Sequence, residues 1–512
     1  MAKKQPFFSL KNLRILLAIF VFGVLTFFFV DFNHTISTKW HILGHIQFIP
    51  AVLAGSFGIL AVLILLTLLF GRIYCSVICP LGVLQDIIAW FSKKFNKKKK
   101  YSYSKPKNIL RWSVLGVFII ALICSFTLLV GLLEPYSIFG RIATHVFRPI
   151  YFEINNLFEK IFTSYGYYTF YKINIVFSWH SFLIAMISFF AIGFFALKHG
   201  RTFCNTICPT GTILGFLSKY SFFKIRINET KCNSCGVCAM KCKAACINSK
   251  EREIDYSRCV DCFDCLNVCN QKAMKFSRTK NQEPRAKTID SDKRKFLATS
   301  LLTAISIPVL LAQGKEIILK GGQKIFTRKT PISPPGSKSH KNLLRKCTSC
   351  HLCISKCPSK VLKPALMEYG LAGMMQPIMT FEKGYCNYNC TVCGDVCPTT
   401  AIMPLTKREK HEAQVGVVVF NRDICVVVKY EFNCGACAEH CPTQAVKMVP
   451  YKYGLTIPEI NTDICIGCGG CEYICPVRPY RAIFVEGNEV HQTAKVENNG
   501  EDKSIKINDF GF

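Results

Sequence analysis

The sequence predicts an α-helical membrane domain, with four spans in two repeats, joined to small α+β domains that are organised by cysteines. Two observations lead to this prediction. Four long apolar segments lie in the first 200 residues of the 512-residue chain, and 24 of its 30 cysteines form six groups of four further along. Half of the residues are hydrophobic, which is more than a soluble protein of this kind requires. A further apolar stretch at residues 291–313 is expected to be a fifth span or an export signal.

The spacing of these cysteines indicates iron–sulfur clusters. Four groups read C-x2-C-x2-C-x3-C, the run that places three thiolates around one [4Fe–4S] cubane and sends the fourth to a neighbouring cluster. Zinc sites instead use two separated ligand pairs, and disulfide scaffolds are short secreted chains. We therefore predict α+β ferredoxin-like iron–sulfur domains that hold six [4Fe–4S] clusters. The predicted ligands are Cys232, Cys235, Cys238 and Cys242; Cys259, Cys262, Cys265 and Cys269; Cys347, Cys350, Cys353 and Cys357; Cys386, Cys390, Cys393 and Cys397; Cys425, Cys434, Cys437 and Cys441; and Cys465, Cys468, Cys471 and Cys475.

The apolar segments are predicted spans, and a run of lysines orients them. Residues 93–107 contain eight lysines and no acid, so the positive-inside rule places this loop in the cytoplasm. Residues 31–50 and 134–172 then face outward. The same loop chemistry explains much of the net charge of +32, so nucleic-acid binding is not expected. The predicted spans are Leu13–Val30, Ala51–Phe70, Trp112–Leu133 and Ile173–Leu197.

Both halves of the membrane domain carry the same loop. Residues 71–82 and 200–211 each begin with Gly-Arg, continue with C-x3-C-P and end with Gly, and each follows a span. A pseudo-twofold axis between the halves would bring together Cys75, Cys79, Cys204 and Cys208 at the membrane surface. These thiols are candidates for a seventh cluster or another metal, or for dithiols in a redox cycle. The alternative is that Gly and Pro shape a tight turn and the thiols only pack.

The motifs also set the expected domain boundaries. We expect a membrane domain at 1–215, a cytoplasmic two-cluster ferredoxin domain at 216–290, an anchor or signal at 291–313, a linker at 314–340, an extracytoplasmic four-cluster domain at 341–490, and a polar tail at 491–512. Lys293-Arg294 opens a motif that resembles a twin-arginine export signal, with Lys in place of the first Arg. Such a signal suits a domain whose clusters are assembled before export.

The pairing of quartets follows a rule only in the cytoplasmic domain. There the fourth cysteine of each run is expected to bind the other cluster. This rule groups Cys232, Cys235, Cys238 and Cys269, and separately Cys259, Cys262, Cys265 and Cys242. Cys246 is either a spare buried thiol or a competing ligand. In residues 341–490 the partners are neighbouring or nested quartets, with a strand at Val415–Asn421 and helical turns after the C-P dipeptides.

The order of these motifs resembles the NapH and NapG ferredoxin-type components of periplasmic nitrate reductase systems, fused in one chain. Residues 1–280 are similar to NapH, with four spans, two C-x3-C-P loops and a two-cluster ferredoxin. Residues 291–490 look like NapG, with an export-type signal, a Pro334-Pro335-Gly336 arm and four quartets. The resemblance implies quinol oxidation at the inner (cytoplasmic) membrane and electron delivery to a periplasmic reductase of nitrate or nitrous-oxide respiration.

The leading functional hypothesis is therefore a multi-pass membrane protein that passes electrons from quinol, or a cytoplasmic donor, to an extracytoplasmic redox partner. Histidines on the outer side of the spans are candidates for quinol chemistry; they are His34, His41, His45, His145 and His180. A second hypothesis is an accessory protein for maturation or redox repair of a metalloenzyme, in which the C-x3-C-P dithiols react. No catalytic nucleophile–base set or phosphate loop is evident, so substrate chemistry is expected on another protein.

Overall fold

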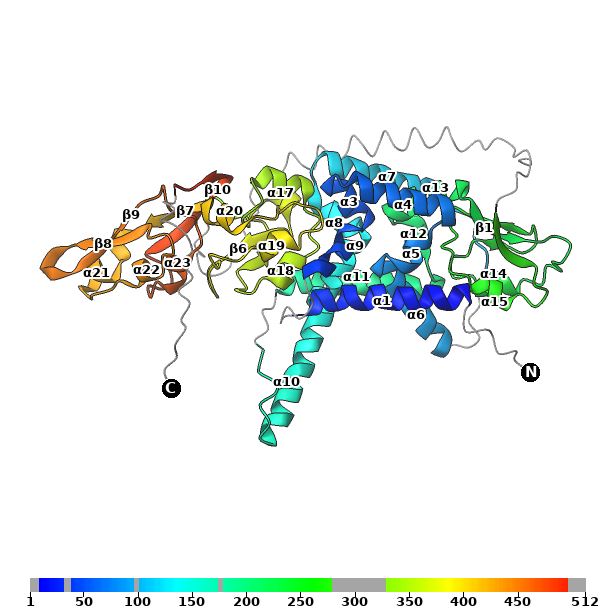
Figure 1. Cartoon of the computed structure of the whole chain (residues 1–512), viewed down its shortest axis with the longest axis horizontal. Helices are drawn as coiled ribbons and strands as arrows, with labels where there is room; N and C mark the ends of the chain where they lie inside the picture. Colours follow the sequence, from blue (N-terminus) through cyan, green and yellow to red (C-terminus); the bar gives the residue numbers. More distant parts are fainter. Residues whose placement is uncertain (1–8, 32–37, 96–100, 174–177, 279–327, 496–512) are drawn as a thin grey trace, which may run out of the picture.

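A computed structural model gives the arrangement of the chain. It describes residues 9–31, 38–95, 101–173, 178–278 and 328–495. The predicted anchor or signal at 291–313, His34 and the polar tail from residue 496 lie outside the described residues. A helical domain occupies the centre of the molecule (Figure 1). Residues 216–278, the two-quartet domain, lie at one end of it, and residues 328–495, the four-quartet domain, extend from the other end.

Two helices of the described chain are long and apolar enough to cross a membrane, α1 and α11. Two further predicted spans, Ala51–Phe70 and Trp112–Leu133, are each divided between two helices. Helix α3 is separated from α4 at Gly55, and α7 from α8 around Ser125. The helices of this domain are α1 (Leu10–Val30), α2 (Ile42–His45), α3 (Phe48–Ala54), α4 (Phe57–Phe70), α5 (Ile73–Val77), α6 (Pro80–Phe95), α7 (Asn108–Ile123), α8 (Thr127–Leu133), α9 (Pro135–Ile142), α10 (Arg148–Ser164), α11 (Trp179–His199), α12 (Thr202–Thr206) and α13 (Pro209–Leu217).

Both interruptions have the same local geometry. Gly55 and Ser125 have positive φ angles of 69° and 56°. Each residue closes the preceding helix, and the backbone N–H of the next residue reaches back five positions, from Ser56 to Ala51 O (3.0 Å) and from Phe126 to Ala121 O (2.8 Å). This closure satisfies carbonyl groups that the helix end would otherwise leave without partners.

Two helices that follow α8 have contrasting environments. All eight residues of α9 are buried, and Glu134 caps its first turn by accepting from the backbone N–H of Tyr136 (3.0 Å) and of Ser137. A π-helical turn, η2 (Ala143–Phe147), leads into α10, which projects away from the bundle (Figure 1). Apolar residues such as Ile154 and Leu157 remain exposed on α10.

The two-quartet domain consists of short elements around its cysteines. Strand β1 (Phe223–Ile227) pairs antiparallel with β4 (Met274–Arg278), and β2 (Ile247–Asn248) pairs with β3 (Glu253–Ile254). Helices α14 (Val237–Lys241) and α15 (Asp264–Val268) pack against each other. This α+β arrangement agrees with the predicted ferredoxin-like fold.

The four-quartet domain repeats this plan over a longer stretch. Its strands form three antiparallel pairs, β5 (Leu362–Pro364) with β6 (Pro377–Met379), β7 (Ala413–Phe420) with β10 (Ile483–Thr493), and β8 (Val446–Pro450) with β9 (Thr456–Ile460). Its helices are α17 (His340–Lys346), α18 (Leu352–Lys356), α19 (Val392–Asp395), α20 (Lys407–Glu412), α21 (Val426–Tyr430), α22 (Ala436–Glu439) and α23 (Gly470–Ile474). The strand expected at Val415–Asn421 is β7.

Two local expectations for this domain need correction. Short helices precede the C-P dipeptides instead of following them, as α18 does before Cys357. The segment expected as a linker up to residue 340 is also structured, because residues 332–337 are buried. Ile332 O accepts from Met379 N (2.9 Å) and Gly336 O from Met403 N (2.9 Å), so the Pro-Pro-Gly arm packs into the domain.

Candidate metal centres

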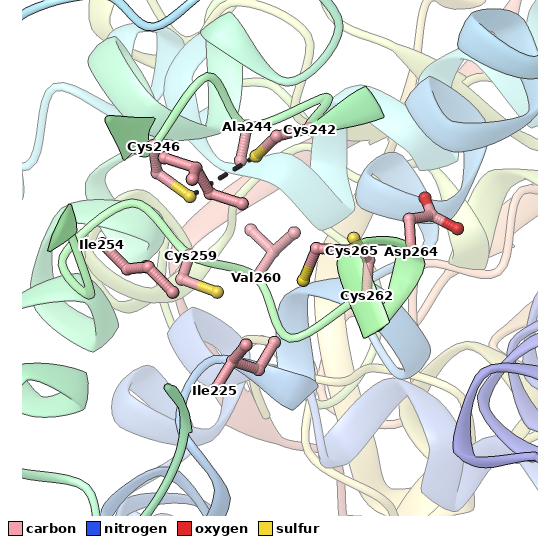
Figure 2. Close-up of a pocket in the computed structure, with 11 residues that line it drawn as sticks. Ile225, Cys242, Ala244, Cys246, Ile254, Cys259, Val260, Cys262, Asp264 and Cys265 are labelled. Carbon is pink, nitrogen blue, oxygen red and sulfur yellow. Dashed lines mark hydrogen bonds between the residues drawn. The ribbon is translucent and has the colours of Figure 1, made fainter. Parts of the chain in front are cut away.

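A buried cavity in the two-quartet domain collects cysteines from both of its quartets. Cys259, Cys262 and Cys265 line it together with Cys242, the fourth cysteine of the other run (Figure 2). This is the grouping that the cross-ligation rule predicts, with three thiols from one run and one from the other.

The remaining cysteines of this domain form the complementary set. Burial raises the pKa of Cys238, and the nearby thiolates of Cys232, Cys235 and Cys269 raise it further. The fourth cysteine of the second run therefore lies beside the first three of the first run.

Cys246 stands at the wall of the cavity as a fifth thiol. Its Sγ lies 3.5 Å from Cys242 Sγ, and its side chain is 1% exposed (Figure 2). The Cys246 side chain also reaches Cys259. Cys246 is thus in contact with two predicted ligands.

The four-quartet domain exchanges cysteines between neighbouring quartets. Cys357 lines a cavity with Cys386, Cys390 and Cys393. In the converse set, burial raises the pKa of Cys353, and the thiolates of Cys350, Cys347 and Cys397 raise it further. The first and second quartets of this domain are therefore partners.

The third and fourth quartets are partners in the same way. Cys475 lines a cavity with three cysteines of the preceding quartet; they are Cys425, Cys434 and Cys437. Burial raises the pKa of Cys471, with further increases from the thiolates of Cys468, Cys465 and Cys441. Of the two pairings that the sequence left open, the structure has the neighbouring one and not the nested one.

Burial raises the pKa of several cavity thiols, whereas the hydrogen bond with Cys246 lowers the pKa of Cys242 to about 6. Burial raises the pKa of Cys262 to about 12 and that of Cys347 to about 12. A metal ion deprotonates the thiol that it binds, so the raised pKa values require proton release on metal binding. In the part of the chain that the structure describes, no three His, Cys, Asp or Glu side chains form a site for a single metal ion. In a cubane each thiolate binds a separate iron, so its ligands stand further apart.

The two C-x3-C-P loops bring their four thiols together in the helical domain. Cys75, Cys79, Cys204 and Cys208 are all buried. Burial raises the pKa of Cys208, and the thiolates of Cys204, Cys79 and Cys75 raise it further. These thiols lie in α5, α12 and the turns that precede α6 and α13, after the apolar helices α4 and α11.

Two arginines link the loops by reciprocal hydrogen bonds. Arg72 of the first loop donates from Nη2 to Cys204 O (3.2 Å), and Arg201 of the second donates from Nη1 to Cys75 O (2.6 Å). Arg72 Nη2 also lies 3.8 Å from Cys75 Sγ. Both arginine side chains are fully buried. They place two positive charges beside the thiols, which favours an anionic group there.

The same loops attach the helical domain to the two-quartet domain. Arg72 N donates to Asp261 Oδ2 (2.9 Å), between Cys259 and Cys262 of the cavity. Arg201 N donates to Lys243 O (2.9 Å), next to Cys242. Both contacts join a C-x3-C-P loop to the thiols of one cavity.

A buried carboxylate holds this junction together. Asp86 of α6 accepts salt bridges from Arg14 of α1 (2.9 Å), Arg201 (2.7 Å) and Lys243 of the two-quartet domain (2.8 Å). One carboxylate therefore forms salt bridges with three cations from three parts of the chain.

Tyr74 lies in α5, next to Cys75 of the first C-x3-C-P loop. It is fully buried, and its hydroxyl donates to Gln47 Oε1 (3.0 Å) and accepts from Phe48 N (3.0 Å). Burial raises the pKa of Tyr74, and the nearby charges of Cys79 and Glu134 raise it further. Tyr74 is thus close to both the Cys79 thiol and the capping carboxylate Glu134 of α9.

Helix α9 continues this path to the four-quartet domain. Tyr136 is fully buried and follows Glu134 by two residues. A Cβ placed on Gly44 would lie 3.0 Å from Tyr136 Oη and 3.5 Å from Pro398 Cβ, next to Cys397. Gly140 of α9 approaches the carbonyl group of Cys350. Helix α9 therefore lies against the first pair of quartets.

Further contacts fix the four-quartet domain on the helical domain. Lys356 Nζ forms a buried salt bridge with Asp31 (3.0 Å), at the end of α1. His145 Nε2 lies 2.6 Å from Nδ1 of His351, a buried residue between Cys350 and α18. Burial lowers the pKa of His351, and the charge of His145 lowers it further, so the ring is neutral.

The other candidate histidines are not part of this contact. His41 and His45 stack edge to face with their ring centroids 5.4 Å apart, and His180 starts α11. Of the predicted quinol-site histidines in the described residues, His145 contacts the loop of Cys350, and His45 hydrogen-bonds the backbone of Pro398, next to Cys397.

The sequence families that match the chain agree with these sites. A 4Fe-4S binding domain matches twice, at residues 52–98 and 180–228, and each match contains one C-x3-C-P loop. Two different 4Fe-4S dicluster domains match residues 432–478 and 255–361. These matches make the chain similar to NapH-like 4Fe-4S proteins of the ferredoxin type.

Curated relatives cover parts of the chain. An uncharacterized protein of Methanocaldococcus jannaschii is 28% identical over 258 residues, which are 49% of this chain and 92% of the relative. The methylamine utilization ferredoxin-type protein MauM of Methylobacillus flagellatus is 28% identical over 38% of this chain and 84% of its own length. The ferredoxin-type protein NapH of Escherichia coli is 23% identical over 44% of this chain and 68% of its own length. No solved structure matches.

Sequence reasoning found the cysteines but missed the groups that join them. Arg72 and Arg201 occupy the same place in the two repeated loops, directly after Gly, and this repetition was the available signal. Asp86, Tyr74 and Tyr136 carry no such signal, because their contacts come from segments far apart in the sequence.

Proposed function

We propose that this protein is a membrane-bound iron–sulfur electron carrier whose redox centres line a path across the bilayer. The observation that carries the proposal is the position of the thiols. Cysteine cavities lie in domains at opposite ends of the helical domain, and four further thiols are buried within the helical domain. By the positive-inside rule the two-quartet domain is cytoplasmic, and the four-quartet domain lies outside.

Each quartet would supply three ligands to its own cubane and one to its partner's. [4Fe–4S] clusters supply one-electron transfer when bound. In the cytoplasmic domain the two ligand sets are Cys232, Cys235, Cys238 and Cys269, and Cys259, Cys262, Cys265 and Cys242. In the outer domain they are Cys347, Cys350, Cys353 and Cys397; Cys386, Cys390, Cys393 and Cys357; Cys425, Cys434, Cys437 and Cys475; and Cys465, Cys468, Cys471 and Cys441.

A seventh cluster would be held by Cys75, Cys79, Cys204 and Cys208. The residues around these thiols fit such a group. Arg72 and Arg201 provide two buried positive charges, and a cubane with four thiolates is an anion. The two matches to a 4Fe-4S binding domain, each of which includes one loop, support the same assignment.

The chain connects these sites through close contacts. Arg72 ties the membrane thiols to Asp261 on the cytoplasmic side, and Tyr74 is close to both the same thiols and the capping carboxylate of α9. Helix α9 in turn contacts the quartets that contain Cys350 and Cys397. Buried aromatic and backbone groups that exclude water therefore fill the distance between the centres.

Quinol is the proposed membrane substrate, and a reductase outside the membrane is the proposed partner. The relationship to NapH and NapF supports a role with redox partner proteins. His145 is the proposed hydrogen-bond partner of quinol at the outer side, since it contacts His351 in the loop of Cys350, and burial lowers its pKa to about 3, which keeps the ring neutral. A neutral His351 hydrogen-bonded to Met375 O (2.9 Å) would orient the His145 ring.

Reduction by quinol in membrane vesicles tests this function. Vesicles that contain the full chain receive menaquinol, and the absorbance of the iron–sulfur clusters is followed. Bleaching by menaquinol, reversed by an oxidant outside the membrane, supports the electron carrier. Clusters that respond to neither would contradict it and would favour maturation or redox repair of a metalloenzyme, in which the four membrane thiols act as dithiols.

A further inference from the structure

A wide pocket opens where the helical domain meets the two-quartet domain. It lies between the first turn of α7, the end of α13 and Ser257, which precedes Cys259 by two residues. The pocket is separate from the cavities that the cysteines line.

The charges along the pocket have one sign. Four of its lining residues are cationic, Lys105, Lys107, Arg111 and Lys219, and none is acidic. The nearby Asp255 forms its salt bridge with Arg258 (2.7 Å) and not with one of the four lining cations. A pocket with this lining attracts an anion.

Arg111 gives the pocket a fixed donor. Its residue is 5% exposed, and it donates from Nη1 to Ser257 Oγ (3.0 Å) and from Nη2 to Ser257 O (3.3 Å). These two bonds hold the guanidinium in place, whereas its buried Nε has no hydrogen-bond partner in the described structure. A buried donor without a partner is costly, so a ligand that accepts from Nε would be stabilised.

The other wall of the pocket is apolar. Trp112 and Phe216 meet edge to face with their ring centroids 6.1 Å apart, and they are 41% and 44% exposed. Ile109 and Leu110 of α7 continue this wall. The pocket therefore places cations beside an exposed apolar and aromatic surface, the combination found at the interface between a bilayer and water.

We propose that this pocket binds an anionic phospholipid, with its phosphate group at Arg111, Lys107 and Lys219 and its acyl chains along Trp112 and Phe216. The inference rests on the proposed membrane placement of α7. Basic pockets beside spanning helices on the cytoplasmic side bind such headgroups. A soluble phosphate would make no use of the apolar wall, and a quinone headgroup would not require four cations.

The bound lipid would stabilise the junction between the two domains. Arg111 holds Ser257, and Arg72 Nη1 also donates to Ser257 O (3.0 Å). The lipid phosphate, Arg111 and Ser257 would thus form a continuous chain of contacts to the loop that carries Cys259 and to the arginine beside the membrane thiols.

Lipid binding to the full chain tests the inference. The metallated protein in a non-ionic detergent is titrated with phosphatidylglycerol and with phosphatidylcholine of the same acyl chains, and bound lipid is counted by native mass spectrometry. The test variant is Lys107→Gln with Lys219→Gln. The matched control is Lys198→Gln, a cation in the last turn of α11 that lies over the Phe194 ring outside the pocket.

We expect one phosphatidylglycerol to bind more tightly than phosphatidylcholine. Each neutralised lysine should weaken binding about fivefold, so the double variant should lose about 25-fold, and the control should match the wild type. Equal affinity for both lipids, or an unchanged double variant, would overturn the proposal. Displacement by millimolar inorganic phosphate would indicate a soluble anion instead, and displacement by menaquinone a quinone site. Iron content, measured on the same samples, reports separately on the proposed clusters.

Discussion

At the scale of single residues, Cys246 is a fifth thiol in the cavity of the two-quartet domain. Its thiol lies against Cys242 Sγ in a cavity closed by Val260 and Ile225 (Figure 2). Hydrogen bonds to ligand sulfurs stabilise the more negative, reduced form of a cluster and raise its reduction potential. Cys246 is in position to donate such a bond.

The change Cys246→Ala should therefore lower the reduction potential of the cluster proposed at Cys242, without loss of iron. A hydrogen bond contributes about 1 kcal/mol, which corresponds to a decrease of roughly 40 mV for a one-electron couple. A redox titration followed by electron paramagnetic resonance measures it. Loss of about four irons from the variant would show instead that Cys246 is a ligand.

The residues that the sequence predicts well are those whose chemistry lies in local spacing. The quartets are recognised from gaps of two and three residues, and the cross-grouping of Cys242 with Cys259 follows from the same rule. Asp86 contacts Arg201, which lies more than a hundred residues away in the sequence. Tyr74 contacts Gln47, which lies some tens of residues away. No local pattern announces them.

At the scale of elements, the tight approach of the two C-x3-C-P loops depends on glycine. A Cβ on Gly211 would collide with Cys204 O and with the Arg72 guanidinium, and the equivalent Gly82 approaches Cys75 O and Arg201. Only a residue without a side chain lets the helix after each C-P lie on the cysteine turn before it.

We expect Gly211→Ala to destabilise the protein by about 1–3 kcal/mol through overpacking and to reduce the iron content. Its matched control is Gly193→Ala in α11, where no atom lies within 4 Å of the new Cβ and the substitution favours the helix. Iron analysis and thermal unfolding of both variants provide the measurement. Equal iron content and equal unfolding temperatures in the two variants would argue against close packing of the loops.

The Asp86 network makes a second element-scale prediction. Asp86→Asn leaves Arg14, Arg201 and Lys243 without their shared carboxylate, and removal of one partner from a buried ion pair costs about 3–5 kcal/mol. Thermal loss of cluster absorbance should occur at a markedly lower temperature in Asp86→Asn than in the wild type. Glu382→Gln, which breaks a partly exposed pair with Lys363, serves as the control and should cost under about 1 kcal/mol. A variant as stable as this control would refute the network's role.

The elements themselves could be predicted only in part. Apolar composition located the helices of the membrane domain, but it did not reveal the breaks at Gly55 and Ser125, because both flanks of each break are equally apolar. The short helices before each C-P dipeptide were misplaced, since a cysteine loop has no apolar period that marks a helix. Sequence also gave no sign that residues 332–337 are buried.

At the scale of the whole molecule, the helical domain separates two groups of cysteine cavities and contains four thiols between them (Figure 1). The salt bridge between Asp31 and Lys356 joins the four-quartet domain to the helical domain, and Asp86 joins the two-quartet domain to it. The sequence predicted the number of quartets and their division into two and four. How the membrane thiols join the two groups required the structure, because Arg72, Arg201 and Tyr74 act through long-range contacts.

Iron content of the purified full chain tests this arrangement most directly. Seven cubanes of four irons predict about 28 irons per chain, and the double variant Cys79→Ser with Cys208→Ser should retain about 24. The variant isolates the centre within the helical domain, because neither residue belongs to the six quartets of the ferredoxin domains. About 24 irons in both proteins, or zinc in place of iron, would contradict the account.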